Sequence, residues 1–264
     1  MKKGHKGLKL IIMAVTLLFF YLPIIHTIIF SFNESKSLSK FTGFSLQWYE
    51  KMFHNRDMMM SVFYTILIAV LATLISTVIG TITAIGLSRS RKIVKALVSQ
   101  VNDMPVMNPD IVTAIGLLMF FSVLGLRKGF MTMLAAHVMF CIPYVILSVT
   151  PKLRSLDPNL LDAAMDLGCT PMQALIKVIV PQISSGILSG ALIAFTMSFD
   201  DFVISYFVTG NGVNNISIMA YTMTKRINPS INALTTLIVV IITIALTFVN
   251  IISYVSAKKK RRKV

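Results

Sequence analysis

The stretch that decides the fold is "LDPNLLDAAMDLGCTPMQALIKVIVPQ", residues 156–182, which lies between two long apolar runs. Asp157 and Pro158 are typical of a helix start, because a carboxylate caps the first turn and proline at the first helical position has no N–H to lose. Gly168 is predicted to end this helix in the left-handed conformation. Residues 170–173, "TPMQ", have the spacing of a capping box and are predicted to start a second helix. The stretch therefore predicts two short polar helices between apolar segments.

Long apolar runs occupy most of the remaining chain. Of its 264 residues 55% are hydrophobic and 13% are charged, and the mean hydropathy is +0.78. A soluble globular domain carries about 25% charged residues, so this class is excluded. Runs of about 20 apolar residues, enough for a helix to cross a bilayer, occur at 10–32, 62–87, 96–124, 130–149, 183–208 and 231–255. The sequence predicts an all-α membrane protein with six transmembrane helices in a single domain, residues 1–264.

The basic residues predict how these helices are oriented. All 25 Lys and Arg fall outside the six runs, and with the N-terminus inside, 17 of them lie on cytoplasmic segments and 8 on outer segments. The positive-inside rule therefore places both termini, and a loop at 151–182, in the cytoplasm. The net charge of +15 is interpreted as the topology signal of a multi-pass protein of the cell (cytoplasmic, or inner) membrane, without nucleic acid as a partner.

The 151–182 loop carries a spaced motif. Asp162, Ala163 and Ala164 are followed after three residues by Gly168, and nine further residues lead to "VIVP", which ends at Pro181. The pattern resembles the cytoplasmic signature of ABC importer permeases, which is Glu-Ala-Ala, three residues, Gly, nine residues, Ile-x-Leu-Pro. Four positions match by identity, and Asp replaces Glu at the first. The resemblance implies that this loop couples the chain to a separate ATP-hydrolysing subunit by docking into its cleft.

The nucleotide site is expected on that other polypeptide. The sequence contains no G-x-x-x-x-G-K-[ST] phosphate-binding loop. We therefore expect no enzymatic activity and no cofactor or metal in this chain, and ATP with Mg²⁺ on a partner ATPase.

Two adjacent acids, Asp200 and Asp201, lie within the apolar run at 183–208. A charged residue near the centre of a membrane helix costs about 2.5–3.5 kcal/mol on insertion scales, so this pair is a functional hypothesis. Neighbouring helical residues point about 100° apart, so one of the two is expected to face a translocation path while the other contacts a helix. The alternative is that both are hydrogen-bonded packing residues.

Two more acids, Asp103 and Asp110, belong to the run at 96–124 and are seven residues apart. This spacing places them on similar faces of a helix. Pro105 and Pro109 disturb that helix, and Asn108-Pro109-Asp110 is similar to a half-helix restart of the kind that transporters place beside a substrate. Asp110 and Asp103 are therefore candidates for the substrate path. Alternatively, Asp110 is a cap of the restarted helix.

Aromatic residues flank the acid pair, among them Phe199, Phe202 and Tyr206. Carboxylates beside aromatic faces suit an elongated organic cation, through charge pairing and cation–π contacts. By helical spacing alone, a stripe of Phe in a membrane helix is usually a packing feature. His137 is interpreted as a hydrogen-bonded helix-contact residue rather than a metal ligand. Gly186 and Gly190 form a small-xxx-small pattern. This pattern predicts a helix face that packs closely against another helix.

Four further segments narrow the resemblance. They are "SFDDFVISYFVTG" (198–210), "MNPDIVTAIGLL" (107–118), "AAHVMFCIPYVILSV" (135–149) and "GFSLQWYEKMF" (43–53). They resemble the second permease subunit of spermidine/putrescine ABC importers, along nearly the whole chain. The resemblance implies a six-helix permease fold of the methionine-importer type. It also implies a homologous second permease, two copies of an ATP-binding subunit and an extracytoplasmic polyamine-binding protein as partners.

Three other functions are alternatives to polyamine import. Permeases of related ABC importers for another small solute share the fold and the loop, but an anion importer would place basic groups on its path, and the six runs contain none. A secondary cation transporter would use membrane carboxylates without needing the coupling loop. A scaffold protein leaves the acids unexplained. For Trp48 and Tyr49 two interpretations stay open, an interfacial belt or a docking patch for the binding protein.

Overall fold

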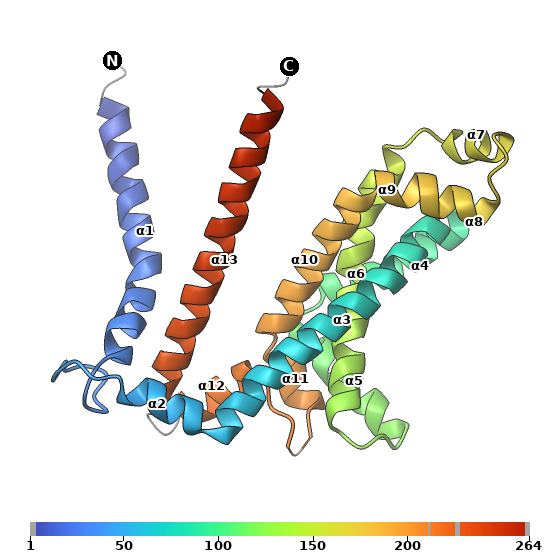
Figure 1. The fold of residues 1–264 in the computed structure, drawn as a ribbon. Coiled ribbons are helices and arrows are strands. Elements are labelled where there is room, and N and C mark those ends of the chain that lie inside the picture. Colours follow the sequence, from blue (N-terminus) through green and yellow to red (C-terminus); the bar gives the residue numbers. More distant parts are fainter. Residues whose placement is uncertain (1–3, 211, 225–227, 262–264) are drawn as a thin grey trace. The chain divides into compact units, whose positions relative to one another are not determined.

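The computed structural model describes residues 4–210, 212–224 and 228–261, and within these ranges it consists of helices, loops and one β-bridge between Asn33 and Phe44 (Figure 1). The all-α prediction is confirmed. The chain forms two compact units: a first unit, up to Met59 and from Ala220 onward, and a second unit, Met60–Met219.

The first unit contains α1 (Gly4–Ser31), α2 (Gln47–His54) and α13 (Ser230–Arg261), and α13 packs against both other helices. Asn33 organises the connection between α1 and α2, since its side chain donates to the carbonyls of Ser37 (2.9 Å) and Lys40 (3.0 Å). Trp48 is 4% exposed and donates from its indole N–H to the Asn33 carbonyl at 2.6 Å. Trp48 therefore stabilises this connection from inside. Neither an interfacial belt nor a docking patch, the two interpretations from the sequence, includes this role.

The second unit is built around α6, which packs against α10, α11 and α4. Figure 1 shows α6 and α10 side by side. The elements of the second unit are α3 (Arg56–Ser88, which begins in the first unit), α4 (Lys92–Met107), α5 (Asp110–Val123), α6 (Phe130–Arg154), α7 (Leu160–Asp166), α8 (Pro171–Ala174), the π-helix η1 (Leu175–Ile179), α9 (Val180–Gln182), α10 (Ser184–Asp200), α11 (Val203–Val208) and α12 (Ile216–Thr224, which continues into the first unit).

Glycines let three helices of the second unit approach closely around Val145. A Cβ built on Gly80 of α3 would lie 2.7 Å from the Val145 Cβ, and one on Gly190 of α10 would lie 3.1 Å from the Val145 Cα. On Gly186 the nearest atom would be the Lys152 Cγ, at 2.7 Å. Both α10 glycines are buried. The predicted close-packing face is therefore confirmed, and α6 is its partner.

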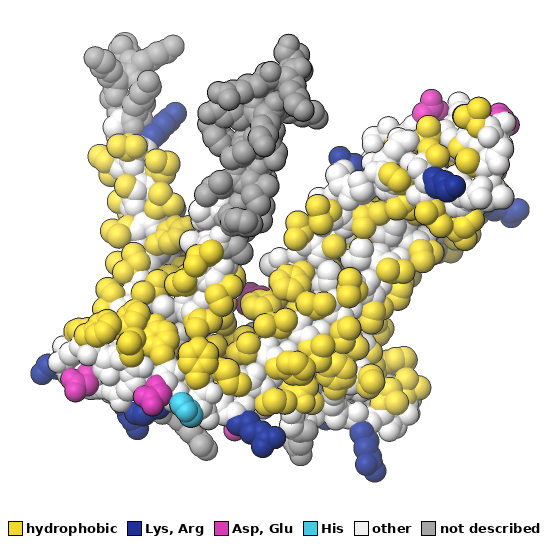
Figure 2. Space-filling view, viewed as in Figure 1, with side chains coloured by type: hydrophobic (Ala, Val, Ile, Leu, Met, Phe, Trp, Pro, Cys, Tyr) yellow, Lys and Arg dark blue, Asp and Glu magenta, His cyan; other side chains and the backbone are white. Residues whose placement is uncertain are grey.

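Three described helices are long and apolar enough to cross a membrane, namely Gly7–Ser31, Arg56–Ser88 and Phe130–Arg154. Two bent helix pairs raise this number to five if each pair forms one span. Ser230–Ile244 of α13 forms a shorter apolar helical segment. Figure 2 shows hydrophobic side chains over the middle of the second unit and charged ones toward its ends, as expected for helices that cross a bilayer.

The run at 96–124 is not one continuous span. It divides into α4 and α5, which meet at an angle of 111°. Asn108 is extended (φ −84°, ψ 149°), because the ring of Pro109 disfavours helical backbone in the residue before it. The restart at Asp110 is thus confirmed, but the expectation that Asp103 and Asp110 share a helix face is wrong.

Candidate functional site

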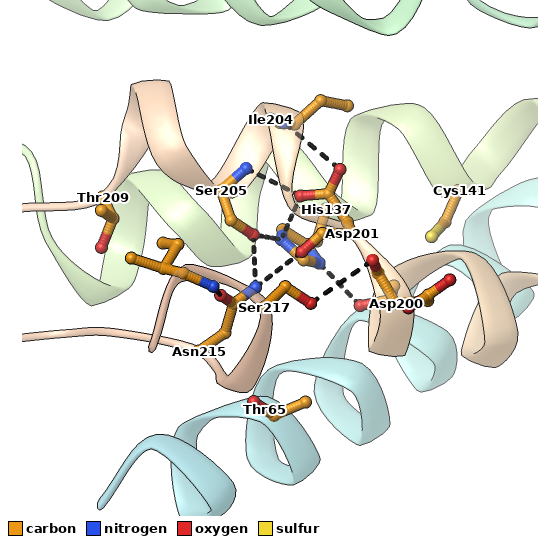
Figure 3. Close-up of polar contacts among 12 residues, drawn as sticks. Thr65, His137, Cys141, Asp200, Asp201, Ile204, Ser205, Thr209, Asn215 and Ser217 are labelled. Atoms are coloured by element: carbon orange, nitrogen blue, oxygen red, sulfur yellow. Dashed lines mark hydrogen bonds and ion pairs between the residues drawn. The ribbon is translucent and has the colours of Figure 1, made fainter. Parts of the chain in front are cut away.

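The run at 183–208 is also interrupted, at the acid pair. Helix α10 ends at Asp200, Asp201 is extended (φ −63°, ψ 126°), and α11 begins at Val203. The Asp201 carboxylate accepts hydrogen bonds from the backbone N–H groups of Ile204 (3.2 Å) and Ser205 (2.7 Å), as Figure 3 shows. These bonds satisfy the first free donors of α11, so Asp201 acts as a helix cap. Its side chain is 8% exposed.

His137 of α6 joins the two halves of this broken helix. Its Nδ1 lies 2.7 Å from the Ser198 Oγ of α10, and its Nε2 lies 2.9 Å from the Ser205 Oγ of α11. The same Nε2 is 3.6 Å from the Asp201 Oδ2. Asn215 donates to the Asp201 carbonyl (2.7 Å) and to Ser205 Oγ (2.9 Å). His137 is 1% exposed. The helix-contact interpretation of His137 is therefore confirmed, and its network holds the break in place (Figure 3).

Asp200 has different surroundings from its neighbour. It is the last residue of α10, and it is exposed. Its backbone carbonyl accepts from Ser217 Oγ at 3.5 Å, and in the part of the chain that the structure describes no salt bridge involves its carboxylate. The two acids are thus divided into one exposed and one buried residue. Asp200 is the one whose carboxylate is accessible to a substrate, and its role in a path remains a prediction.

The aromatic residues beside the acids pack mainly with one another. Phe199 stacks on Phe195, with ring centroids 5.8 Å apart, and Phe202 lies 5.5 Å from Tyr206 in a tilted arrangement. Tyr206 is 48% exposed and lines a cavity of about 500 Å³ beside Lys128. The exposed ring of Tyr206 is therefore the one most accessible to a cation from this group.

The acids of α4 and α5 stand apart from each other. Asp103 is half-buried and accepts from the Asn102 side chain at 3.3 Å. Asp110 is exposed and is the first residue of α5, but no side-chain capping bond forms at that helix start, where Pro109 is the cap residue. The structure thus gives no support to the capping interpretation of Asp110. Its place on a substrate path stays a prediction.

Sequence reasoning missed the partners that hold the break, Ser198, Ser205 and Asn215. Ser205 could have been found, because it follows Asp201 by four residues and its N–H belongs to the first turn of a restarted helix. Ser198 and Asn215 carry no such local signal, since their contacts depend on how the helices pack.

The loop between α6 and α10 has the predicted turn chemistry. Gly168 has φ +90°, its N–H donates to the Met165 carbonyl (2.9 Å), and the N–H of Cys169 donates to the Ala164 carbonyl (3.1 Å). This pair of bonds is a Schellman motif, which ends α7 at a left-handed glycine. The capping box at 170–173 is also present. Both local predictions are confirmed.

The first loop helix begins later than expected. The Asp157 carboxylate accepts from the Asn159 N–H at 2.9 Å, and α7 starts only at Leu160. Asp157 and Pro158 therefore form a turn before the helix, because an Asp side chain that bonds to the backbone two residues on competes with helix geometry.

The second loop helix does not stop at α8, and it ends one residue after Pro181. It runs on through η1 and α9 to Gln182 and meets α10 at 70°. The Val180 N–H donates to the Leu175 carbonyl, five residues back. Proline lacks an N–H and crowds the carbonyl four residues before it, which explains a wider π turn at this position.

The motif residues divide by exposure. Ala164 is 7% exposed and faces the interior of the loop. Asp162, Ala163, Gly168 and Pro181 are exposed. An outer surface of small and acidic side chains is thus available to another subunit, and its use for coupling stays a prediction.

Comparisons with known proteins agree with this architecture. Residues 76–264 match the family model described as binding-protein-dependent transport system inner membrane component. The chain is 37% identical over 230 residues to the spermidine/putrescine transport system permease protein PotC of Haemophilus influenzae, which covers 87% of this chain and 90% of that protein.

Two solved structures show the same fold. A bacterial ABC transporter involved in the import of the acidic polysaccharide alginate has a TM-score of 0.70 at 14% identity, covering 93% of this chain and 95% of that one. The MetNI methionine ABC transporter has a TM-score of 0.56 at 19% identity, covering 70% and 90%. The predicted permease fold of the methionine-importer type is therefore confirmed.

Proposed function

The chain belongs to the family of binding-protein-dependent transport system inner membrane components, and we propose that it is a permease subunit of an ATP-driven importer of polyamines. The similarity along most of the chain to a permease named for spermidine and putrescine carries this proposal. This chain would form the translocation path, and another subunit of the complex would hydrolyse ATP.

The accessible carboxylate of Asp200 supports a polycationic substrate. A polyamine carries two or more ammonium groups that are strongly hydrated, and moving them through a membrane requires fixed negative charge in place of that water. Asp200 lies at the break between α10 and α11 and is exposed, while the exposed ring of Tyr206 adds an aromatic face. Asp110 and Asp103 are further candidates along the path. Asp201 positions the break rather than touching the substrate.

The loop helices supply the link to the ATPase. With Gly168 holding α7 and α8 in a fixed turn, the exposed side chains of Asp162, Ala163 and Pro181 would fit a cleft on the ATP-binding subunit. Two copies of that subunit, which bind ATP and Mg²⁺, a homologous permease and an extracytoplasmic polyamine-binding protein would complete the importer. The excess of basic residues on the predicted cytoplasmic segments supports cytoplasmic termini.

Uptake in whole cells tests this function. Cells that lack polyamine uptake would express this chain with its partner subunits, and entry of radiolabelled spermidine and putrescine would be followed. We expect uptake that requires all subunits and cellular ATP, and that persists when the proton gradient is removed while ATP is maintained. Uptake that follows the proton gradient would identify a secondary transporter instead, and a complete complex that imports neither polyamine would refute the substrate.

A further inference from the structure

The end of the second unit that carries the loop helices contains a cavity of about 500 Å³ that transport does not explain. Its apolar floor includes Ile85 of α3, Leu161 of α7 and Ile179 of η1. Leu161 and Ile179 are 7% and 8% exposed, so this floor is continuous with the hydrophobic core of the unit. Figure 2 shows charged side chains gathered at the same end.

Three basic side chains from separate parts of the chain line this cavity. Arg89 follows the end of α3, Lys95 lies in the first turn of α4, and Arg154 is the last residue of α6. Lys95 is half-buried. The first turn of α4 contains no acidic residue, and Arg91 at its start makes no side-chain capping bond. Of the residues that start α4, only Lys95 lines the cavity.

Two acids, Asp157 and Asp162, line the same cavity as the three cations. The Asp157 carboxylate accepts the Asn159 N–H at 2.9 Å, and Asp162 is exposed on α7. Within the described ranges, no salt bridge joins either acid to one of the three cations. With three cations and two acids, the lining of the cavity carries one net positive charge.

We propose that this cavity binds an anionic phospholipid of the cytoplasmic leaflet. The phosphate would lie among Arg89, Lys95 and Arg154, with the glycerol and the first part of an acyl chain on the apolar floor. A free phosphate ion would contact only the basic rim, whereas a lipid would contact both the basic rim and the apolar floor. Basic pockets between helix ends on the cytoplasmic side suit such headgroups, because that leaflet is rich in anionic lipid. The choice of leaflet rests on the cytoplasmic location of the loop given under the proposed function.

Counting bound lipid on the purified importer tests the proposal. The complete complex would be extracted in mild detergent, and retained phosphatidylglycerol would be measured by native mass spectrometry. The cavity variant is Arg89→Gln, Lys95→Gln, Arg154→Gln. The matched control, Arg91→Gln, Lys92→Gln, Lys177→Gln, removes three exposed cations at the same end that do not line the cavity. We expect affinity to fall about fivefold per cavity cation removed, and the control to retain its lipid.

Each outcome decides the proposal. Equal retention by the two triple variants would refute it, and so would a wild-type complex that binds inorganic phosphate at the cavity but retains no more phosphatidylglycerol than phosphatidylcholine. If the triple cavity variant does not assemble, the single variants Arg89→Gln and Arg154→Gln apply, since both side chains are exposed. Lipid retention requires neither polyamine nor transport, so it is independent of whether the substrate assignment holds.

Discussion

Asp200 and Asp201 are adjacent in the chain but have different neighbours. The Asp201 carboxylate accepts hydrogen bonds from two backbone N–H groups of α11, and it lies 3.6 Å from His137. The Asp200 side chain is exposed at the end of α10. The two residues should therefore differ in what their substitution changes.

We expect Asp200→Asn to lower polyamine uptake about tenfold at an unchanged unfolding temperature, because it removes an accessible charge and no internal contact. Asp201→Ala should instead destabilise the protein by about 1–2 kcal/mol, since it leaves the first donors of α11 unsatisfied. Uptake at matched protein level and thermal unfolding of the purified complex measure the two effects. Normal uptake by Asp200→Asn would show that its carboxylate does not contact the substrate.

At the scale of elements, the glycine between α7 and α8 determines the shape of the loop. Gly168 has φ +90°, and a Cβ there would meet no atom within 4 Å. A side chain at this position is therefore disfavoured by the backbone conformation and not by a steric clash.

Gly168→Val should abolish transport while the chain still inserts and assembles, because the Schellman turn that orients α7 is lost. Gly168→Asn is the matched control, since asparagine tolerates the left-handed region better and should retain part of the activity. ATP-dependent uptake and the amount of co-purified ATPase would be measured for both. Wild-type uptake by the valine variant would mean that this turn has no coupling role.

The packing of α3 on α6 depends on a different glycine. A Cβ on Gly80 would lie 2.7 Å from the Val145 Cβ, whereas one on Gly116 of α5 would meet nothing within 4 Å. We expect Gly80→Ala to destabilise the protein by about 1–3 kcal/mol through overpacking. Gly116→Ala should be neutral or slightly stabilising in a helix.

Thermal unfolding of the two purified variants measures this difference. Adding Val145→Ala to Gly80→Ala should recover part of the loss, because it removes the clashing atoms. Equal unfolding temperatures for the two glycine variants would show that α3 and α6 do not pack this closely.

At the scale of the whole molecule, the chain is one component of a larger assembly. Expressed and purified alone, it should neither hydrolyse ATP nor support ATP-dependent uptake, because the sequence contains no phosphate-binding loop and the proposed importer needs further subunits. ATPase activity of the purified chain, tested beside a complex reconstituted with its partners, is the measurement. ATP hydrolysis that co-purifies with this chain alone would contradict the proposal that a separate subunit hydrolyses ATP.

Local features could be predicted from the sequence by itself. The apolar runs, the left-handed Gly168, the capping box at 170–173 and the helix restart at Asp110 depend on residues within a few positions of one another. Backbone sterics and short-range hydrogen bonds determine such features wherever the chain lies. The spacing of Gly186 and Gly190 likewise predicted a packing face, although not its partner.

Only the tertiary structure decided which acid of the pair is buried, the partners of His137 and the 111° angle between α4 and α5. His137 and Ser198 are 61 residues apart in sequence, and their contact exists only because α6 packs on α10. Asp200 and Asp201 are the same residue type in the same run, so local propensity cannot separate them. The packing of α11 and the need to satisfy its buried N–H groups assign Asp201 to the interior and leave Asp200 accessible.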